Sequence, residues 1–318
     1  MDSLIEARKI TKIYSDGTVA LRNVDFSVRP GEVMGLLGEN GAGKTTLTKI
    51  LSGLLSPTTG TILWKGKAVR FSSPREALLA GIGMVHQHFA LVGPFSGIEN
   101  IALGAEGGPL LAPVQIKRIR AKVEEIMKST GLQAPLDVPV EDLPVGVQQR
   151  IEILKVLFRE VELLILDEPT AVLTPQEVEE LFVVLRKLAD SGKSVIFITH
   201  KLREVLAVAD RITVLRRGEL VGVRNAKESS VEELARLMVG REISPVRRRG
   251  TQALGPEVLR VRDLVVPGPG GELSVRGVSF SVHAGEILGI AGIQGNGQTE
   301  LVEALVGLRP WKGQVELN

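Results

Sequence analysis

The feature that most constrains this chain is a glycine-rich turn between an expected strand and an expected helix. Residues 38–45 read GENGAGKT, which fits the phosphate-loop pattern GxxxxGK[ST]. The apolar run at residues 32–37 predicts a buried strand before the turn, and residues 44–54 carry apolar side chains at helical spacing after it. Glycines let backbone N–H groups wrap a phosphate, and a helix N-terminus adds partial positive charge. This context favours a phosphate site over a chance glycine-rich turn.

The residues of the turn are candidate contacts of a bound nucleotide. Lys44 is expected to reach the β- and γ-phosphates, and Thr45 is expected to hold Mg²⁺. The other candidate binding residues in the turn are Gly38, Glu39, Asn40, Gly41, Ala42 and Gly43.

The chain then repeats this segment. Residues 24–54 read VDFSVRPGEVMGLLGENGAGKTTLTKILSGL, and residues 278–308 read VSFSVHAGEILGIAGIQGNGQTELVEALVGL. The two align without a gap, which indicates a duplicated domain and not a short-period solenoid. The duplication also explains much of the glycine content, 35 of 318 residues, because both copies carry the same turn.

Length and composition narrow the other possibilities. At about 150 residues per domain, the length suggests about two domains. Hydrophobic residues make up 44% of the chain, which excludes a wholly disordered or fibrous protein. A net charge of +2 gives no argument for nucleic acid, so we expect no such partner, and the lack of cysteine excludes disulfides and thiolate chemistry. No apolar stretch approaches the ~20 residues that span a bilayer, and we expect no secretion signal.

Short apolar runs alternate with helical patterns along the first 240 residues. Thr174 and Glu177 form a capping-box pattern with Pro175 at the first helical position, and Gly131 is expected to close a helix at residues 115–128. Further buried strands are expected at residues 82–85, 163–166, 195–199 and 212–215. Alternation of this kind predicts a mainly parallel sheet covered by helices.

Two acids follow the apolar strand at residues 163–166. Carboxylates at the carboxyl end of such a strand face the crevice where ligands bind in open α/β sheets. Asp167 is expected to hold Mg²⁺, directly or through water. Glu168 is expected to polarise the attacking water as general base. Alone, such a pair is usually just solvated; together with the phosphate loop it predicts a hydrolytic site.

Three other side chains lie where strands are expected to end. His200 follows residues 195–199 and is a candidate partner of the γ-phosphate, although a lone histidine is more often structural. Gln87 is a candidate contact of Mg²⁺ and of the attacking water. Its neighbours His86 and His88 raise the alternative of a metal site, but the sequence has no third ligand close to them, so we do not expect one. Tyr14 is a candidate platform for a base, with a partly exposed strand-end aromatic as the alternative.

Taken together, these motifs resemble the ATP-binding subunit of an ABC transporter. The resemblance covers nearly all of residues 4–223 and then residues 258–317 as the start of a second copy. It implies an α/β P-loop NTPase fold with a mainly parallel sheet core, an antiparallel β edge and a helical subdomain. The matching elements, in the family's order, are Tyr14 (adenine stacking), residues 38–46 including Thr46 (Walker A), Gln87 (Q-loop), residues 143–150 (signature), Asp167–Glu168 (Walker B) and His200 (switch).

The resemblance also implies the domain organisation. A complete nucleotide-binding domain is expected at residues 1–240, with a helical subdomain at about 90–160. A polar linker at residues 241–256 contains the run Arg247–Arg249, which we expect to be solvated. Residues 257–318 correspond to the beginning of a second domain, so the length resembles that of a truncated protein and we expect exposed sheet edges or partial disorder there.

Duplicated domains joined by a short linker, with GQT in the second phosphate loop, resemble bacterial importers of simple sugars and nucleosides. The segment GMVHQHFALV is similar to the nucleoside branch. The resemblance implies ATP and Mg²⁺ as cofactors, integral-membrane permease subunits and an extracytoplasmic solute-binding protein as partners, and a place at the cytoplasmic face of the cell membrane. Residues 90–99 would contact the permease, with Phe89, Leu91 and Phe95 as candidate contacts or, equally, as subdomain core.

Two positions depart from the general family pattern. Pro144 replaces the signature serine expected to bond the γ-phosphate of the opposite domain, and Gln298 replaces the phosphate-binding lysine of the second loop. In the family each ATP site joins one domain's Walker A to the other's signature, so both departures fall in the same composite site. The other site, built on Lys44, needs a signature that lies outside the 318 residues. We therefore expect this chain to bind MgATP but to hydrolyse it poorly alone, without a second ATPase domain or copy.

Two other functions compete with transport. A soluble duplicated ABC ATPase acting on ribosomes would resemble this chain, but those proteins carry a long charged helical linker, and the linker here is short. A non-catalytic ATP sensor is the other, and the intact Lys44, Asp167 and Glu168 argue against it.

Overall fold

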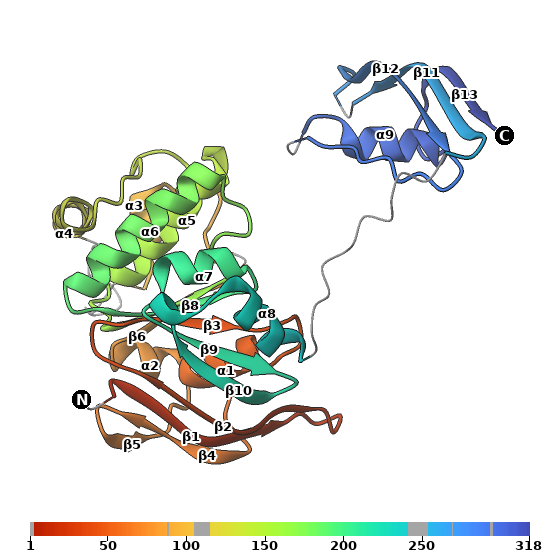
Figure 1. Ribbon diagram of the computed structural model, residues 1–318. Coiled ribbons are helices and arrows are strands. Elements are labelled where there is room, and N and C mark those ends of the chain that lie inside the picture. The colour runs from red at the N-terminus through yellow and green to blue at the C-terminus, as the bar shows by residue number, and fades with distance from the viewer. Residues whose placement is uncertain (1–2, 88, 105–114, 241–253, 269, 293–294) are drawn as a thin grey trace. The chain divides into compact units, whose positions relative to one another are not determined.

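The computed structural model describes residues 3–87, 89–104, 115–240, 254–268, 270–292 and 295–318. The chain divides into two compact units, Met1–Ile243 and Ser244–Asn318, here called the N-terminal and C-terminal units (Figure 1). Within the described residues, no helix is both long and apolar enough to cross a membrane.

A mainly parallel sheet forms the centre of the N-terminal unit. Its strand order is β10-β9-β3-β8-β7-β6, and only β10 runs antiparallel to its neighbour. The strands are β3 (Val33–Leu37), β6 (Ile82–Val85), β7 (Leu163–Asp167), β8 (Ser194–Thr199), β9 (Arg211–Arg216) and β10 (Glu219–Asn225). Each parallel strand expected from the sequence is present, with bounds that differ by one residue at most.

The central strands are buried on both faces, as expected of a parallel sheet. Because side chains alternate along a strand, each strand supplies two separate cores. The face toward α1 carries Met34, Leu36, Ile165, Ile196 and Ile198. The opposite face carries Val33, Leu164, Leu166, Val195 and Phe197.

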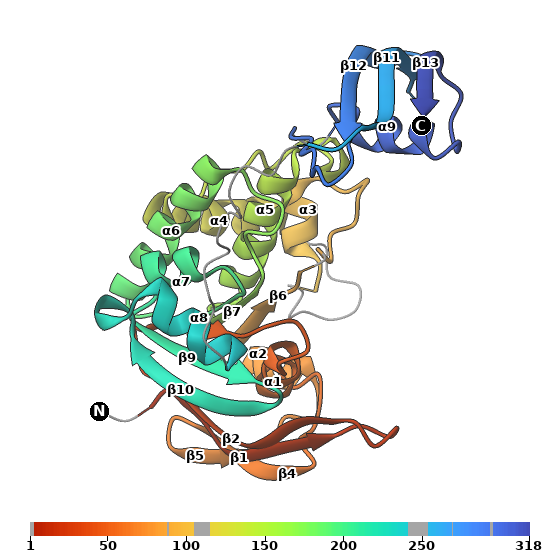
Figure 2. The same cartoon turned by 45° about the vertical axis from the view of Figure 1, so that its right-hand side comes forward.

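An antiparallel sheet covers the first of these faces. Its order is β2-β1-β4-β5, and α1 packs between it and the parallel sheet (Figures 1 and 2). The antiparallel strands therefore form a sheet of their own, in addition to the edge strand β10. The elements of this layer are β1 (Ile5–Ile13), β2 (Val19–Val28), α1 (Lys44–Leu51), β4 (Thr59–Trp64), β5 (Lys67–Val69) and α2 (Pro74–Leu79).

Helix α1 is shorter than its apolar spacing predicts. It was expected to continue to residue 54, but it ends at Leu51 because Gly53 adopts φ 73°, and Leu54 and Leu55 both donate back to the carbonyl of Lys49. A left-handed glycine after the last turn is a common helix stop.

Helices cover the second face of the parallel sheet. The predicted capping box of Thr174 and Glu177 is present with Pro175 at the first position, and Gly131 closes its helix in the left-handed conformation. These helices are α3 (Gly97–Ala102), α4 (Ile116–Thr130), α5 (Val145–Leu157), α6 (Pro175–Asp190), α7 (Leu202–Val208) and α8 (Val231–Val239), with short 3₁₀ turns at Val140–Asp142 and Ala226–Glu228. The α/β fold with a mainly parallel core is thereby confirmed.

The C-terminal unit repeats the first elements of the N-terminal unit. A sheet of order β12-β11-β13 packs on α9, as β2-β1-β4 packs on α1. Even a strand irregularity is repeated, because Lys9 and Asp263 both have positive φ and each donates its N–H to a side chain sixteen residues later, Asp25 and Ser279. The elements are β11 (Glu257–Pro267), β12 (Leu273–His283), α9 (Gln298–Leu305) and β13 (Lys312–Leu317).

The two copies differ at the segment that corresponds to β3. Residues 287–291, which align with β3, form no strand, and Ile287 is 97% exposed. In the N-terminal unit β3 pairs with β8 and β9 on its two sides. Among the described residues of the C-terminal unit, no strand corresponds to β8 or β9. The apolar segment that aligns with β3 is therefore not paired in a sheet.

Gly35 lets α7 approach the sheet closely. A Cβ at this position of β3 would lie 2.2 Å from Val205 Cγ2 and 3.2 Å from Ala209 Cβ. Such contacts force backbone or side-chain shifts in a packed core. The missing side chain therefore determines how near α7 lies to the central strands.

We expect Gly35→Ala to lower the free energy of unfolding by about 1–3 kcal/mol, the usual cost of overpacking. Adding Val205→Ala removes the clashing methyl groups, so the double variant should lose less stability than the sum of the single variants. Thermal and urea unfolding would measure this. Gly289→Ala is the matched control, because a Cβ there meets nothing within 4 Å. Strict additivity of the two changes would contradict the packing argument.

Candidate functional site

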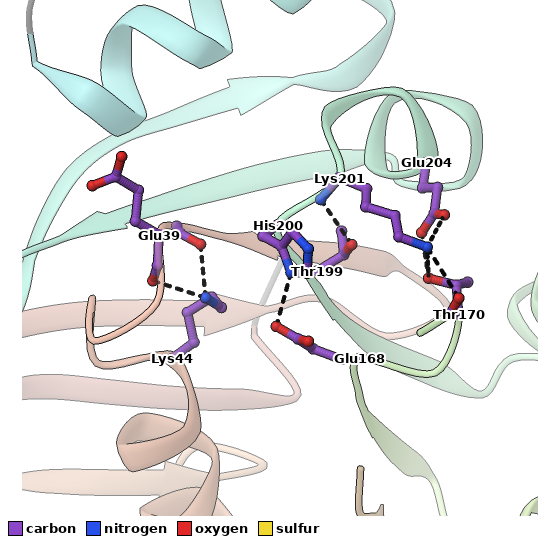
Figure 3. Close-up of polar contacts among 9 residues, drawn as sticks. Glu39, Lys44, Glu168, Thr170, Thr199, His200, Lys201 and Glu204 are labelled. Carbon is purple, nitrogen blue, oxygen red and sulfur yellow. Dashed lines mark hydrogen bonds and ion pairs between the residues drawn. The ribbon is translucent and has the colours of Figure 1, made fainter. Parts of the chain in front are cut away.

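The candidate site lies at one edge of the parallel sheet, where β3, β8 and β7 end side by side. Leu37 pairs with Thr199, and Asp167 pairs with Ile198, so the residues that follow these strands meet there. The phosphate loop follows β3, Glu168 follows β7 and His200 follows β8 (Figure 3). Adjacent parallel strands thus bring together residues that are far apart in the sequence.

The phosphate loop requires glycine at two positions because other backbone approaches closely. A Cβ at Gly38 would lie 2.5 Å from the carbonyl oxygen of Leu215. A Cβ at Gly43 would lie 2.7 Å from that of Ala20, and Gly43 also has φ 102°. Gly41 adopts φ 79°, which glycine allows at little cost. The loop therefore turns tightly and places Lys44 at the start of α1.

Lys44 is the buried cation of the site. Its Nζ donates to the carbonyl oxygens of Gly38 at 2.7 Å and Glu39 at 3.0 Å, so the side chain curls over its own loop (Figure 3). Burial lowers the pKa of Lys44, and the nearby carboxylates of Glu168 and Asp167 act in the opposite direction. A desolvated ammonium group next to a helix N-terminus is suited to hold an anion.

Asp167 and Glu168 have different surroundings although they are neighbours in sequence. Asp167 is buried, and burial raises its pKa; the charge of Glu168 adds to the rise, while Lys44 opposes it. The Glu168 Oε1 lies 3.1 Å from His200 Nδ1 (Figure 3). Glu168 also adopts φ 47°, a left-handed conformation that is uncommon outside glycine. The structure thus brings together Lys44, both acids and His200.

The other predicted residues lie around this centre. Gln87 follows β6, which pairs with β7 up to Val85 and Leu166, so it lies at the same sheet edge with an exposed side chain. Tyr14 follows β1, and its hydroxyl lies 3.1 Å from Thr46 Oγ1. Asn40 and Thr45 are exposed at the loop and the first turn of α1.

The signature segment begins helix α5. Pro144 is the exposed N-cap residue and provides no side-chain hydrogen bond, as expected of proline. Gly146 packs so close to α6 that a Cβ would lie 2.2 Å from Glu177 Oε1. Arg150 pairs with Glu180 at 2.6 Å. This end of α5 is therefore fixed against α6.

The remaining predictions concern the candidate permease contacts, the residues around His88 and the linker, and a metal site. Leu91 packs against the helical core, whereas Phe95 is exposed. His88 and the linker with Arg247–Arg249 lie outside the described residues. No group of three or more histidine, cysteine, aspartate or glutamate side chains gathers among the residues that are described.

Sequence reasoning missed the residues that hold the turn after Glu168. Gln149 Nε2 donates to the carbonyl of Pro169 at 2.6 Å, and Lys201 Nζ donates to that of Thr170 at 3.0 Å. Thr170 Oγ1 donates to Glu204. Lys201 and Thr170 lie within two residues of the predicted site residues His200 and Glu168, and this closeness in sequence could have indicated them. The contact of Gln149 comes from α5, and no sequence pattern indicates it.

The site combines a backbone cradle, a buried cation, two carboxylates and a histidine. The cradle and Lys44 suit a polyphosphate, because both present N–H donors to anionic oxygen. Buried Asp167 suits a divalent cation beside the phosphates. Glu168 with His200 suits the activation of a water molecule.

Comparison with known proteins gives the same picture. A family model described as "ABC transporter" matches residues 21–171. The chain is 47% identical over 307 residues to the nucleoside import ATP-binding protein NupA of Lactococcus lactis subsp. cremoris, covering 96% of this chain and 60% of that protein. It is 46% identical over 319 residues to the guanosine import ATP-binding protein NupO of Bacillus subtilis, covering 100% of this chain and 62% of that protein.

A solved structure gives an independent comparison. The structure of cbiO1 from Clostridium perfringens, part of the ABC transporter complex cbiONQ, matches with TM-score 0.65 and 31% identity, over 74% of this chain and 93% of that one. The chain spans about three-fifths of the length of the two curated relatives, at 60% and 62%. Family model, relatives and solved structure agree, and this chain belongs to the ATP-binding proteins of ABC transporters, a family of ATPases.

Proposed function

We propose that this chain binds MgATP at the edge of its parallel sheet and hydrolyses it to power solute import. The observation that carries the proposal is the meeting of the phosphate loop, Asp167, Glu168 and His200 at one sheet edge. In this proposal the phosphates lie in the loop from Gly38 to Thr46, with Lys44 turned from its own loop carbonyls toward the β- and γ-phosphates. Tyr14, fixed near Thr46 by its hydroxyl, stacks on the adenine.

A magnesium ion would be held by Thr45, Gln87 and Asp167. All three provide oxygen ligands, which Mg²⁺ prefers. Asp167 ends β7, and Gln87 comes just after the neighbouring strand β6. When bound, the ion would neutralise charge on the phosphate oxygens. The same ion would compensate the burial of Asp167.

Glu168 is proposed as the general base for the attacking water. The contact between its Oε1 and His200 Nδ1 supports this role, because a fixed carboxylate presents its free lone pairs in a defined direction. His200 would hydrogen-bond the γ-phosphate through its other ring nitrogen. Gln87 would help to orient the water.

The proposed biological role is import of a nucleoside or simple sugar. The names of the two curated relatives support a nucleoside, and they describe import, not action on ribosomes. The chain would act at the cytoplasmic face of the cell membrane with permease subunits and an extracytoplasmic solute-binding protein. Residues 90–99 would contact the permease, with the exposed Phe95 as the strongest candidate.

The proposed organisation is one complete nucleotide-binding domain at residues 1–240 and the beginning of another at 257–318, joined by a linker at 241–256. A second domain or second copy would complete each ATP site. Pro144 and Gln298 would weaken the same composite site. Hydrolysis would then occur mainly at the site that contains Lys44 and Glu168.

The central test is Glu168→Gln, which keeps the shape of the side chain but removes the base. We expect ATP hydrolysis to fall by about 10²- to 10⁴-fold while ATP binding is retained. Phosphate release by the assembled transporter and equilibrium binding of a fluorescent ATP analogue measure the two effects. The control is Glu162→Gln, an exposed acid at the opposite end of β7. Unchanged turnover in Glu168→Gln would exclude Glu168 as the base.

A second prediction concerns affinity. Lys44→Ala should weaken ATP binding about 10- to 100-fold, because a hydrogen bond to a charged group contributes about 1.5–3 kcal/mol. Isothermal titration with MgATP would measure the loss. Lys128→Ala, on the exposed end of α4, removes the same charge far from the loop and should have no effect. Equal affinities of the two variants would rule out the proposed phosphate site.

The solute is tested with the full-length protein, its permease and its solute-binding protein in liposomes. We expect guanosine or another nucleoside to stimulate ATP hydrolysis and to accumulate, whereas ribose alone does neither. Stimulation by ribose and not by nucleosides would assign the transporter to the sugar class. Stimulation by neither would contradict the import proposal.

A further inference from the structure

A hydrogen-bonded cluster beside the site joins the segment after β8 to the turn after β7. Lys201 Nζ lies 3.0 Å from the Thr170 carbonyl oxygen, 3.4 Å from Thr170 Oγ1 and 2.9 Å from Glu204 Oε1. Thr170 Oγ1 in turn donates to Glu204 Oε2 (Figure 3). The hydroxyl group of Thr170 thereby donates to Glu204, and three oxygen atoms surround the Lys201 ammonium group. We call Thr170, Lys201 and Glu204 the turn clamp.

The turn clamp is well placed to resist movement. Thr170 is only 2% exposed and the Glu204 side chain 15%, whereas the Lys201 side chain is 40% exposed, so the hydrogen bond between Thr170 and Glu204 is the one that lies largely out of water. Hydrogen bonds in such surroundings are stronger than at the surface. Lys201 is also the N-cap residue of α7, and its backbone N–H donates to Thr199 Oγ1 at the end of β8. The clamp is therefore anchored in the sheet.

The turn that it holds contains Glu168, a non-glycine site residue with a left-handed backbone conformation. Glu168 has φ 47°, which a glutamate leaves readily unless its neighbours prevent it. Its N–H donates to Ile198 of β8 at 3.1 Å, and the next carbonyl, of Pro169, accepts from Gln149. The turn clamp then holds Thr170, the residue after Pro169. Glu168 is thus fixed from β8, from α5 and from α7.

The clamp and the histidine belong to one short segment. His200 contacts the Glu168 carboxylate, and Lys201, the next residue, contacts the carbonyl two residues beyond Glu168. One segment therefore contacts the turn at its beginning and at its end. A shift of the turn relative to this segment would change the distance between Glu168 Oε1 and His200 Nδ1 directly.

We propose that Lys201 and Glu204 are positioning residues that, by holding Thr170, keep the Glu168 carboxylate in place against His200. This inference rests on the proposed role of Glu168 as the general base. The clamp touches neither nucleotide nor water in this proposal, so its loss should lower kcat and leave the KM for ATP unchanged.

The test uses the full-length ATP-binding protein assembled with its permease. Thr170→Val keeps the size and charge of the side chain but removes the hydroxyl, and Lys201→Met removes the ammonium. We expect each to lower kcat about 10- to 100-fold, the scale of effect of a misplaced catalytic group, with KM within about twofold of the parent. Thr170→Ser restores the hydroxyl and should restore most of the rate.

The matched control is Lys193→Met. Lys193 Nζ also donates to a main-chain carbonyl, that of Val161 at 2.8 Å, but at the opposite end of the sheet. This variant should lose a similar amount of thermal stability without loss of kcat. If Lys193→Met lowered kcat as much as Lys201→Met, the effect would be one of general stability and the proposal would be wrong.

A double-variant experiment separates this inference from the proposed function. In a Glu168→Gln background the clamp has no base to position, so adding Thr170→Val should cause no further loss of the residual hydrolysis. An equal loss in both backgrounds would overturn the positioning role. If Glu168→Gln itself retains full turnover, the proposed function fails; if Glu168→Gln is inactive but Thr170→Val and Lys201→Met keep the parental kcat, only the clamp is refuted.

Discussion

The site depends on the parallel pairing of β3, β8 and β7. In-register parallel strands end at one level, and the pairs Leu37–Thr199 and Asp167–Ile198 show that these three do so. Everything attached to those ends is then placed by the backbone: the phosphate loop, the two acids and the histidine. A shift of one residue in either pairing would turn alternate side chains to the other face and separate Lys44 from Glu168.

Much of the fold and the site could be predicted because local sequence patterns determine it. Apolar runs of four to six residues identified the buried strands, and the capping box at Thr174 identified the start of α6 correctly. The phosphate loop and the acids come at the ends of strands that the alternation of strand and helix patterns predicted to be parallel. The family membership predicted from those motifs is likewise confirmed.

What was missed depends on contacts across the fold. Helix α1 ends three residues earlier than its apolar spacing predicts because Gly53 adopts a left-handed conformation, and the spacing of apolar residues carries no information on φ. The bond from Gln149 to Pro169 joins α5 to the turn after β7, and the tight seat of α7 follows from the absent side chain of Gly35. Such features arise from three-dimensional approach, which a periodic pattern does not contain. The roles of the individual site residues remain predictions, stated above with their tests.

The position of the sheet strands along the chain also matters during synthesis of the N-terminal unit. The sheet partners of β3 come late: Gly31, just before it, bonds to Ser194, 163 positions further on. A ribosome that adds about 5–20 residues per second needs on the order of ten seconds to cover that distance. Until then β3 has neither of its sheet partners, β8 and β9. A nascent chain with this fold therefore leaves the apolar strand β3 unpaired for seconds, and shielding that strand during synthesis is a task suited to a chaperone.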